Sequence, residues 1–433
     1  MKLDAAHAAP DSWECRTIGE ACERITSGGT PSRREPSFYE GGSVPWVKTK
    51  ELNDGVIFAT EELITERALA SSSAKLLPAG TILLAMYGAT VGMLGVLGKP
   101  MACNQACCAL IPSADTDRDY LYYQLLAHRE QLQGLATGAA QQNLSGAQIK
   151  QLVLPFPALD EQKSIGKMLR ILDDRITLLR ETNATLEAIA QALFKSWFVD
   201  FDPVRAKMEG RTPEGMDEAT AALFPDGFET SELGEVPRGW QVRPLDSVAN
   251  YLNGLALQKF PPTGSDDLPV IKIAQLRKGD AVGADLASRA IKPDYVVQNG
   301  DVLFSWSGSL EVEIWCGGEG ALNQHLFKVT SSQYPKWFYY LWTRHHLDNF
   351  RQIAASKATT MGHIQRSHLS AAKVVVGSDA VLDSANGILS PLIDRIVSNA
   401  LQAQTLSTLR DTLLPRLISG QLRLDENVGA INA

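Results

Sequence analysis

The sequence predicts an α+β protein made of two similar mixed domains, each followed by a long helix. Three observations lead to this prediction. LDDRITLLRE at 172–181 returns as LIDRIVSNAL at 392–401, with apolar residues at helical spacing in both. LPAGTILLAMYG at 77–88 is answered by VQNGDVLFSWSG at 297–308. CNQACCALIP at 103–112 is answered by LNQHLFKVTS at 322–331, so one architecture is used twice.

The elements of each repeat follow the same order. WVKTKEL at 46–52 and VIKIAQL at 270–276 are typical of a strand that leads into a polar bend. The copies at 77–88 and 297–308 are typical of strands entered through glycine. YLYYQLLAHREQLQGL at 120–135 has the spacing of an amphipathic helix. Each half therefore predicts short strands followed by helices.

The stretch 81–98 carries no charge and reaches the lower edge of membrane-spanning length. Glycines interrupt it, however, and its counterpart in the second half contains Glu311 and Glu313. A membrane span stays an alternative at this point, but the pattern favours a pair of buried strands joined by a turn.

Both long helices carry an apolar seam with alternating steps of three and four residues, which is the pattern of a coiled coil. Asn183 and Asn399 fall within these seams, where a buried amide typically fixes register. Two such seams predict antiparallel pairing, although separate surface helices packed on their own domains remain an alternative. The seam positions are Ile165, Leu169, Leu172, Ile176, Leu179, Asn183, Leu186, Ala190, Leu193 and Trp197, then Leu392, Ile396, Asn399, Ala403, Leu406, Leu413 and Leu417.

A connector rich in proline and glycine separates the halves and precludes a long helix there. Its length would let the chain start the second domain at the far end of the first helix, so that antiparallel helices separate the domains in a pseudo-twofold repeat. The expected boundaries are 14–158 for the first domain, 159–200 for its helix, 201–232 for the connector, 233–378 for the second domain and 379–424 for the last helix.

The surroundings of the protein are indicated by its N-terminal and cysteine patterns. MKLDAAHAAPDSWE has no apolar stretch behind its lysine, so we expect no signal peptide. The six cysteines lack the paired spacing of a disulfide framework. A reducing cytoplasm and no membrane association are expected.

Five segments together resemble the specificity (S) subunit of type I DNA restriction-modification enzymes. They are GGTPSRREPSFYEGG at 28–42, VPWVKTKEL at 44–52, FKSWFVDFDPVRAKMEGR at 194–211, LFPDGFETSELGEVPRGW at 223–240 and LLPRLISGQLRL at 413–424. The resemblance covers nearly the whole chain. It implies two target recognition domains, each reading one half of a split site in double-stranded DNA, with the two helices as a ruler.

The same resemblance implies partners and cofactors. Two modification subunits, which methylate adenine, would dock on the chain, and optionally two restriction subunits as well. S-adenosylmethionine would bind to the modification subunits and ATP with Mg²⁺ to the restriction subunits, with no cofactor on this chain. Partner contacts are expected on the exposed faces of both helices and at Trp197, Phe198, Phe201 and Arg205.

Charge lends weaker support to DNA binding. The range 14–157 holds 12 basic against 14 acidic residues, and 240–377 holds 14 against 11, within a chain of net charge −8. A stand-alone DNA-binding protein would be more basic. Affinity is therefore expected to need help from partner subunits or from local basic clusters.

Base contacts are expected from polar loop residues, because Gln and Asn pair with adenine edges while Arg and Lys pair with guanine. In the second domain the GGTPS pattern is replaced by NGLALQKF. An ordinary polar turn is the alternative for the QQN run at 141–143. By resemblance to the family, the candidates are Thr30, Ser32, Arg33, Lys48, Lys50, Tyr87, Thr90, Gln141, Gln142 and Asn143, then Gln258, Lys259, Arg277, Lys278, Ser305, Trp306, Lys357, Thr359, Thr360 and His363.

Catalytic and metal motifs give no competing assignment. The only Pro-Pro pair follows Phe260, unlike the pattern with which an amino-methyltransferase grips its target amine. Gly98-Lys99 lacks the other residues of a P-loop. Cys103, Cys107 and Cys108 have no cysteine counterparts in the second copy, so we expect no metal site. A self-contained DNA-modifying enzyme with a divergent site, and an orphan coiled-coil scaffold that no longer reads DNA, stay as alternatives.

Overall fold

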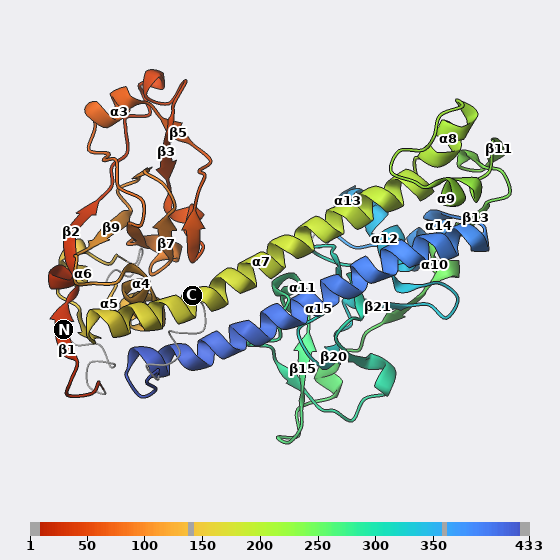
Figure 1. Cartoon of the computed structure of the whole chain (residues 1–433). Coiled ribbons are helices and arrows are strands. Elements are labelled where there is room, and N and C mark those ends of the chain that lie inside the picture. The colour runs from red at the N-terminus through yellow and green to blue at the C-terminus, as the bar shows by residue number, and fades with distance from the viewer. Residues whose placement is uncertain (1–8, 137–142, 357–361, 425–433) are drawn as a thin grey trace. The chain divides into compact units, whose positions relative to one another are not determined.

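The computed structural model describes residues 9–136, 143–356 and 362–424 of a chain that divides into two compact units. Unit 1 comprises 1–175 and 406–433, and unit 2 comprises 176–405. Each unit contains one mixed domain and its share of two long helices, α7 (Leu159–Phe198) and α15 (Asp379–Ile418) (Figure 1). Both helices have 40 residues.

Unit 1 is built on a five-stranded sheet with the order β2-β9-β6-β7-β4. A smaller sheet, β5-β3-β8, and an antiparallel pair, β1 with β10, complete it. Its strands are β1 (Glu14–Thr17), β2 (Cys22–Ser27), β3 (Val44–Val47), β4 (Gly55–Ile57), β5 (Leu63–Ile64), β6 (Ile82–Ala85), β7 (Leu94–Leu97), β8 (Ala102–Cys103), β9 (Cys107–Pro112) and β10 (Val153–Phe156). Its shorter helices are α2 (Ile18–Ala21), α3 (Glu66–Ala70), α4 (Arg118–Ala127), α5 (Arg129–Leu135) and α6 (Gly146–Lys150).

Unit 2 repeats this arrangement with the sheets β14-β21-β18-β19 and β16-β15-β20-β17 and the pair β13 with β22. Its strands are β11 (Phe228–Ser231), β12 (Gly234–Pro237), β13 (Gln241–Pro244), β14 (Asn250–Asn253), β15 (Leu268–Ile271), β16 (Leu286–Ala287), β17 (Val296–Val297), β18 (Val302–Ser305), β19 (Val312–Ile314), β20 (Gly320–Leu322), β21 (Leu326–Thr330) and β22 (Lys373–Val376). Its shorter helices are α8 (Asp202–Met208), α9 (Glu218–Ala222), α10 (Leu245–Val248), α11 (Ile273–Lys278), α12 (Lys336–His345), α13 (Leu347–Ser356) and α14 (Arg366–Ala371).

The strand pairing confirms that one topology occurs twice. In unit 1 β3 runs parallel to β8, with Trp46 opposite Ala102, and in unit 2 β15 runs parallel to β20, with Val270 opposite Ala321. The antiparallel β6–β9 and β18–β21 pairs correspond in the same way. The units differ at their margins, because β4 adds a strand to the large sheet of unit 1 and β17 adds one to the small sheet of unit 2.

The uncharged stretch 81–98 forms the antiparallel pair β6 and β7, with Ile82 opposite Val96 and both strands buried. The pair of buried strands is therefore confirmed, and the membrane span is wrong. No helix among the described residues combines the length and apolar character that crossing a membrane would need.

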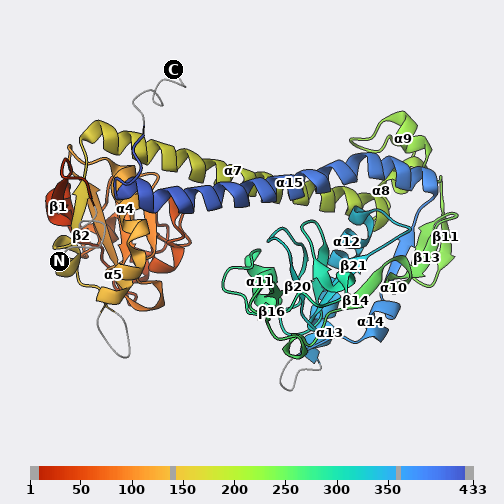
Figure 2. The same ribbon diagram turned by 90° about the horizontal axis from the view of Figure 1, so that it is seen from below.

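The helix α4 differs from the expected amphipathic pattern. It begins after Asp117, whose side chain accepts the backbone N–H of Tyr120, and every residue from Tyr120 to Leu125 is buried. It lies between the sheet of unit 1 and the long helices (Figure 2). Because these central residues are buried on all sides of the helix, the amphipathic assignment is wrong for α4. In α5, the other helix of this segment, Leu132 is buried and Glu130 is exposed, as that assignment predicts.

The long helices pair through their predicted seams, and within each unit they run antiparallel. In unit 1 an Arg410 guanidinium nitrogen lies 2.6 Å from Asp173 Oδ1. In unit 2 Asn399 donates to Asn183 over 2.9 Å, so that later residues of α7 meet earlier residues of α15. The alternative of separate surface helices is therefore wrong.

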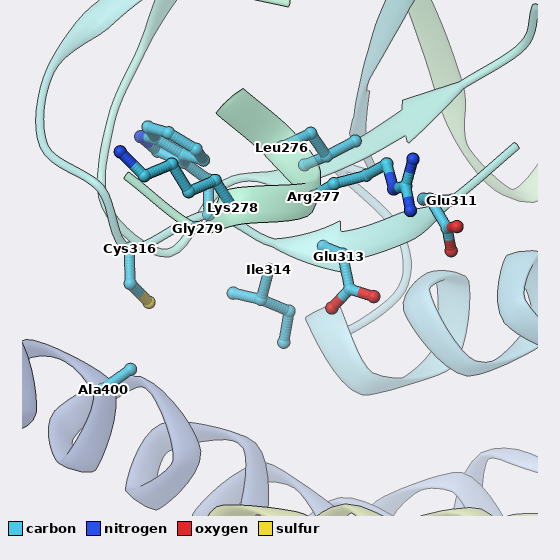
Figure 3. A pocket seen from close by; sticks show the side chains of 10 residues that line it. Leu276, Arg277, Lys278, Gly279, Glu311, Glu313, Ile314, Cys316 and Ala400 are labelled. Atoms are coloured by element: carbon cyan, nitrogen blue, oxygen red, sulfur yellow. The ribbon is translucent and has the colours of Figure 1, made fainter. Parts of the chain in front are cut away.

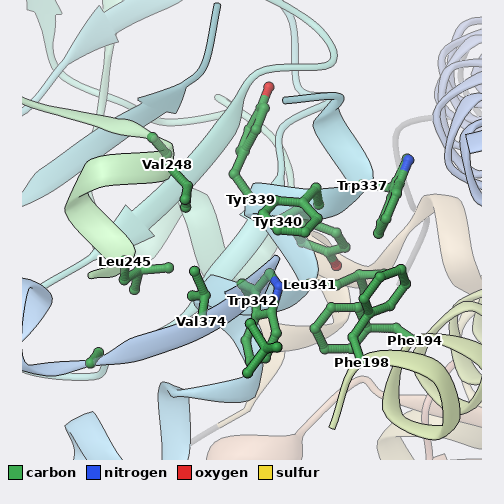
Figure 4. Close-up of a cluster of buried hydrophobic side chains, with 14 of the residues drawn as sticks. Phe194, Phe198, Leu245, Val248, Trp337, Tyr339, Tyr340, Leu341, Trp342 and Val374 are labelled. Carbon is green, nitrogen blue, oxygen red and sulfur yellow. The ribbon is translucent and has the colours of Figure 1, made fainter. Parts of the chain in front are cut away.

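The core of unit 2 joins the end of α7 to α12 through aromatic side chains. Phe194 and Phe198 of α7 pack against Trp337 and Trp342 of α12, with ring centroids 5.0 Å apart for Phe194 and Trp342 (Figure 4). The connector contains short helices α8 and α9 and the hairpin β11–β12, and Phe224 anchors it in the same cluster. Its lack of a long helix is as predicted.

Candidate nucleic-acid interface

Four loops meet at one end of the large sheet in unit 1. We call residues 28–30, 87–90, 104–106 and 143 the first rim. Gly29 donates its N–H to Cys103 O over 2.9 Å, which ties the loop after β2 to the β8–β9 turn. Met86 donates to Ala106 O over 2.8 Å, and Tyr87 forms a β-bridge with Asn143. These bonds hold loops that lie far apart in sequence next to each other.

The same four loops meet in unit 2. We call residues 253–255, 306–310, 323–325 and 362–363 the second rim. Leu255 donates its N–H to Leu322 O over 2.9 Å, and Gly308 donates to Gly362 O over 2.8 Å. Ser307 forms a β-bridge with His363, which repeats the bridge between Tyr87 and Asn143. The two rims therefore have the same backbone and different side chains.

One glycine in each rim allows the backbones to approach closely. A Cβ atom on Gly28 would lie 2.1 Å from Cys103 O, and one on Gly254 would lie 2.1 Å from Asn323 O. No side chain fits at either position. Although NGLALQKF replaces the GGTPS pattern, Gly254 thus occupies the packing position of Gly28.

The first rim presents amides and hydroxyls. Gln105 and Asn143 are exposed, and Tyr87 is half-buried. The Thr30 hydroxyl donates to Gln105 Oε1, and the Thr90 hydroxyl donates to Tyr87 O over 3.2 Å. These groups supply the donors and acceptors that reading of base edges requires.

The second rim is organised around an aromatic side chain. Trp306 donates from its indole nitrogen to Asn253 Oδ1 over 3.0 Å and to Gln324 O over 3.2 Å. The His325 ring lies 5.9 Å from the Trp306 ring and His363 lies 6.3 Å from it, centroid to centroid. The Ser307 hydroxyl lies 3.0 Å from His325 Nδ1.

The basic candidates of unit 1 lie near β3 and β5 and are paired with glutamates. Lys48 Nζ lies 2.6 Å from Glu62 and 3.2 Å from Glu61, and Lys50 lies 2.5 Å from Glu61. Arg33 lies 2.6 Å from Glu62. The hydrogen bond from the Lys48 ammonium, assisted by Arg33, holds the pKa of Glu62 below its usual range. Phosphate contact by these cations would require the ion pairs to open.

The exposed Ser32 hydroxyl is engaged within its own turn, where it accepts the backbone N–H of Arg34 over 3.3 Å.

The basic pair Arg277 and Lys278 of unit 2 lines a cavity of about 470 Å³ together with Glu311, Glu313 and Ala400 (Figure 3). Lys278 also lies 3.0 Å from Asp280. Partial burial raises the pKa of Glu313 to about 7. The mixed charge of this cavity distinguishes it from a purely basic phosphate site.

The other candidates of unit 2 differ in exposure. Gln258 and Lys259 are exposed on a short helical turn beside the second rim. Ser305 is fully buried, and its hydroxyl donates to Ser309 O over 2.6 Å while accepting the N–H of Glu311. Ser305 therefore cannot reach a base from this position, and that prediction is corrected. Gln141, Gln142, Lys357, Thr359 and Thr360 lie outside the described residues.

The expected partner-binding aromatics are core residues. Trp197, Phe198 and Phe201 are each at most 7% exposed and pack in the aromatic cluster of unit 2. A side chain that is already buried in its own unit has no surface to offer a partner, so these three assignments are wrong. Arg205 is exposed and lies over the Phe228 ring, 5.0 Å from its centroid.

The structure adds residues that were missed as candidates. Gln105, Asn253, Gln324 and His325 all lie in the rims. In the sequence, the repeated Asn-Gln dipeptide at 104–105 and 323–324 indicates only the repeat. Its survival in two otherwise divergent copies was the signal that could have identified both glutamines.

Metal and thiol chemistry finds little support in the described part of the chain. No group of three or more His, Cys, Asp or Glu side chains there is placed to hold a metal ion. Cys103, Cys107 and Cys108 are buried, and burial raises the pKa of Cys108 to about 12. Such thiols are poor nucleophiles.

A family model described as the type I restriction modification DNA specificity domain matches residues 10–188 and 237–377. The chain is 27% identical over 431 residues to the type I restriction enzyme MjaIX specificity subunit of Methanocaldococcus jannaschii. This alignment covers 96% of this chain and 95% of that protein. It is 26% identical to the HindI specificity subunit of Haemophilus influenzae, over 63% of this chain and 70% of that one. The fold resembles the crystal structure of a type I restriction-modification S subunit from M. genitalium, with a TM-score of 0.56, 16% identity and coverage of 94% and 96%.

Proposed function

Because this chain belongs to the family of type I restriction-modification DNA specificity proteins, we propose that each of its two rims reads one half of a split DNA site. The chain is a DNA-sequence specificity subunit, and specificity subunits are not themselves catalytic. The proposals on the half-sites and on partner binding are argued from the geometry of the rims and of the long helices.

The observation that carries the proposal is one loop framework with two sets of side chains. The first rim presents Thr30, Gln105 and Asn143, and the second presents Trp306, His325 and His363. Because base edges are distinguished by their donors, acceptors and methyl groups, different side chains on the same frame select different sequences. The two half-sites should therefore differ, which makes the complete target asymmetric.

The paired helices α7 and α15 would set the spacing between the half-sites. Each is continuous over 40 residues, and the Asn183–Asn399 contact pins their register in unit 2. Their exposed faces carry apolar side chains such as Ile189 and Ile388, at 43% and 41% exposure. We propose that two modification subunits dock on these faces and beside Arg205, and that two restriction subunits join through them.

Chemistry in this assembly would come from the partners. S-adenosylmethionine would bind to the modification subunits and ATP with Mg²⁺ to the restriction subunits. Because Arg33, Lys48 and Lys50 are paired with glutamates, much of the phosphate contact would also come from the partners. The assembly would act on double-stranded DNA in the cytoplasm.

The direct test maps methylated adenines in DNA from cells that carry this chain with its modification subunit. In a second strain residues 240–377 are replaced by the same region of a relative. A split motif of which only one half changes in the second strain supports two independent readers. Absence of a motif in the first strain would contradict the proposal.

Two alternatives predict different results. A self-contained DNA-modifying enzyme predicts methyl transfer by the purified chain alone. An orphan scaffold predicts no sequence-selective binding even with modification subunits present, and a flat dependence of binding on salt, since that slope counts neutralised phosphates. The backbone arrangement that the two rims share supports a pair of readers over either alternative.

A further inference from the structure

The repeated Asn-Gln dipeptide occupies the same turn in both units. Asn104 accepts the backbone N–H of Ala106 on its Oδ1 atom over 3.2 Å, and Asn323 accepts the N–H of His325 over 3.2 Å. In each case the asparagine closes the turn on itself. The following glutamine, Gln105 or Gln324, is left to project from the rim.

In the first rim Gln105 is held from one side. The Thr30 hydroxyl donates to its Oε1 atom, which restrains the carboxamide. Gln105 is exposed, and no other hydrogen bond of its side chain occurs among the described residues. Its amide N–H groups and one lone pair of its oxygen are therefore open to a ligand.

In the second rim a chain of polar contacts holds Gln324. Its amide nitrogen lies 3.4 Å from His325 Nε2, and His325 Nδ1 lies 3.0 Å from the Ser307 hydroxyl. Trp306 holds the backbone of this turn, because its indole N–H donates to the backbone carbonyl of Gln324 over 3.2 Å. In the described part of the chain the Gln324 side-chain oxygen has no hydrogen-bond partner. One N–H and the oxygen thus remain available.

We infer that Gln105 and Gln324 are specificity-determining residues that each select an adenine in their half-site. The inference rests on the proposed function. A carboxamide can accept the adenine N6–H on its oxygen and donate from its nitrogen to N7, a pairing that no other base offers. Thr30 in the first rim and His325 in the second are positioning residues that hold the carboxamides, and Trp306 holds the backbone of the turn that carries Gln324.

The test replaces each glutamine by methionine, which keeps the length and removes the hydrogen bonds. Methylated adenines are mapped in cells carrying the full chain with its modification subunit. Gln105→Met should make one adenine position degenerate in one half of the motif, and Gln324→Met should do so in the other half. Discrimination at that position should fall by about 5- to 150-fold, the ratio that corresponds to one bidentate base contact.

Matched controls use exposed glutamines elsewhere in the same units. Gln151→Met at the end of α6 and Gln352→Met on α13 should leave the motif unchanged. Gln105→Glu offers a second readout, because a carboxylate accepts from the cytosine amine and should shift the preference from adenine toward cytosine. The positioning variants Thr30→Val and Trp306→Phe should relax the same positions as the corresponding glutamine variants.

Several outcomes would overturn the inference. These are an unchanged motif in both methionine variants, a change at a position that is not adenine, and a change by both variants in the same half. Loss of all methylation in Gln105→Met and Gln105→Glu, with the complex still assembled, would do so too. A wild-type strain without a split motif would instead reject the proposed function on which the inference rests.

Discussion

Asn399 donates a hydrogen bond from Nδ2 to Oδ1 of Asn183 over 2.9 Å, between the two long helices of unit 2. Asn183 in turn donates from its own Nδ2 to Ile396 O over 2.9 Å. Asn399 is only 5% exposed, so its amide has little access to water. The pair is satisfied only when these residues stand opposite each other, which fixes the register of the helices.

This relationship predicts unequal effects of single and double substitutions. Asn183→Leu, which removes the acceptor, should lower the free energy of unfolding by about 1–3 kcal/mol, since the Asn399 amide stays buried without a partner. The double variant Asn183→Leu with Asn399→Leu should recover most of that loss. Urea unfolding of a double-mutant cycle measures both, with Gln402→Leu on an exposed position of α15 as control. Additive losses would show that the amides do not act as a pair.

A second prediction separates folding from partner binding at the end of α7. Phe198→Ala should destabilise the chain by about 3–5 kcal/mol, because its ring fills the aromatic core of unit 2. Arg205→Ala, at an exposed position, should leave the thermal midpoint nearly unchanged and weaken co-purification with the modification subunit. Unchanged co-purification of Arg205→Ala would show that Arg205 does not contribute to partner binding.

A third prediction concerns the glycines that let the rim loops approach. Gly254→Ala should displace the second rim, because its Cβ would lie 2.1 Å from a carbonyl oxygen. Methylation mapping should then show lost selectivity in one half-site only. Gly387→Ala in α15 is the control, since no atom lies within 4 Å of the new Cβ, and helix propensity predicts a gain of about 1 kcal/mol. Normal specificity in Gly254→Ala would show that the second rim does not take part in recognition.

A fourth prediction follows from Glu313. Its pKa is raised to about 7, mainly by burial, so the folded chain holds this proton more tightly than the unfolded chain. Its contribution to stability is therefore present in full at low pH and is lost as the pH rises toward 7. Glu313→Gln should remove that fall and be the more stable protein at pH 8. After allowance for solvent screening the gain should stay below about 2 kcal/mol.

Urea midpoints between pH 5 and pH 8 measure this difference. Glu235→Gln on the exposed strand β12 serves as its control, because that side chain faces water in both states. Parallel pH profiles for the wild type and Glu313→Gln would show that this carboxyl does not titrate as described.

Local sequence patterns predicted much of the fold. The repeat, the strand pair β6–β7 and the helix seam with Asn183 and Asn399 were all predicted from the sequence, because each depends on side-chain spacing along one segment. The amphipathic assignment failed for α4 because periodicity does not report how many sides of a helix are covered. The burial of Phe198 and Phe201 depends on segments distant in sequence, which no local pattern reports.

Recognition chemistry, by contrast, was decided by tertiary structure. Thr30 and Gln105 stand 75 positions apart, and the pairing of β2 with β9 and the bond from Gly29 to Cys103 bring the hydroxyl to the amide oxygen. Lys48 stays a candidate for DNA contact, but only the fold shows that Glu61 and Glu62 lie beside it. The sequence by itself determined which elements form and that they form twice, since those depend on short-range patterns. Which polar groups remain free for DNA depends on hydrogen-bond partners that are distant in sequence. Those hydrogen bonds form only when the chain folds.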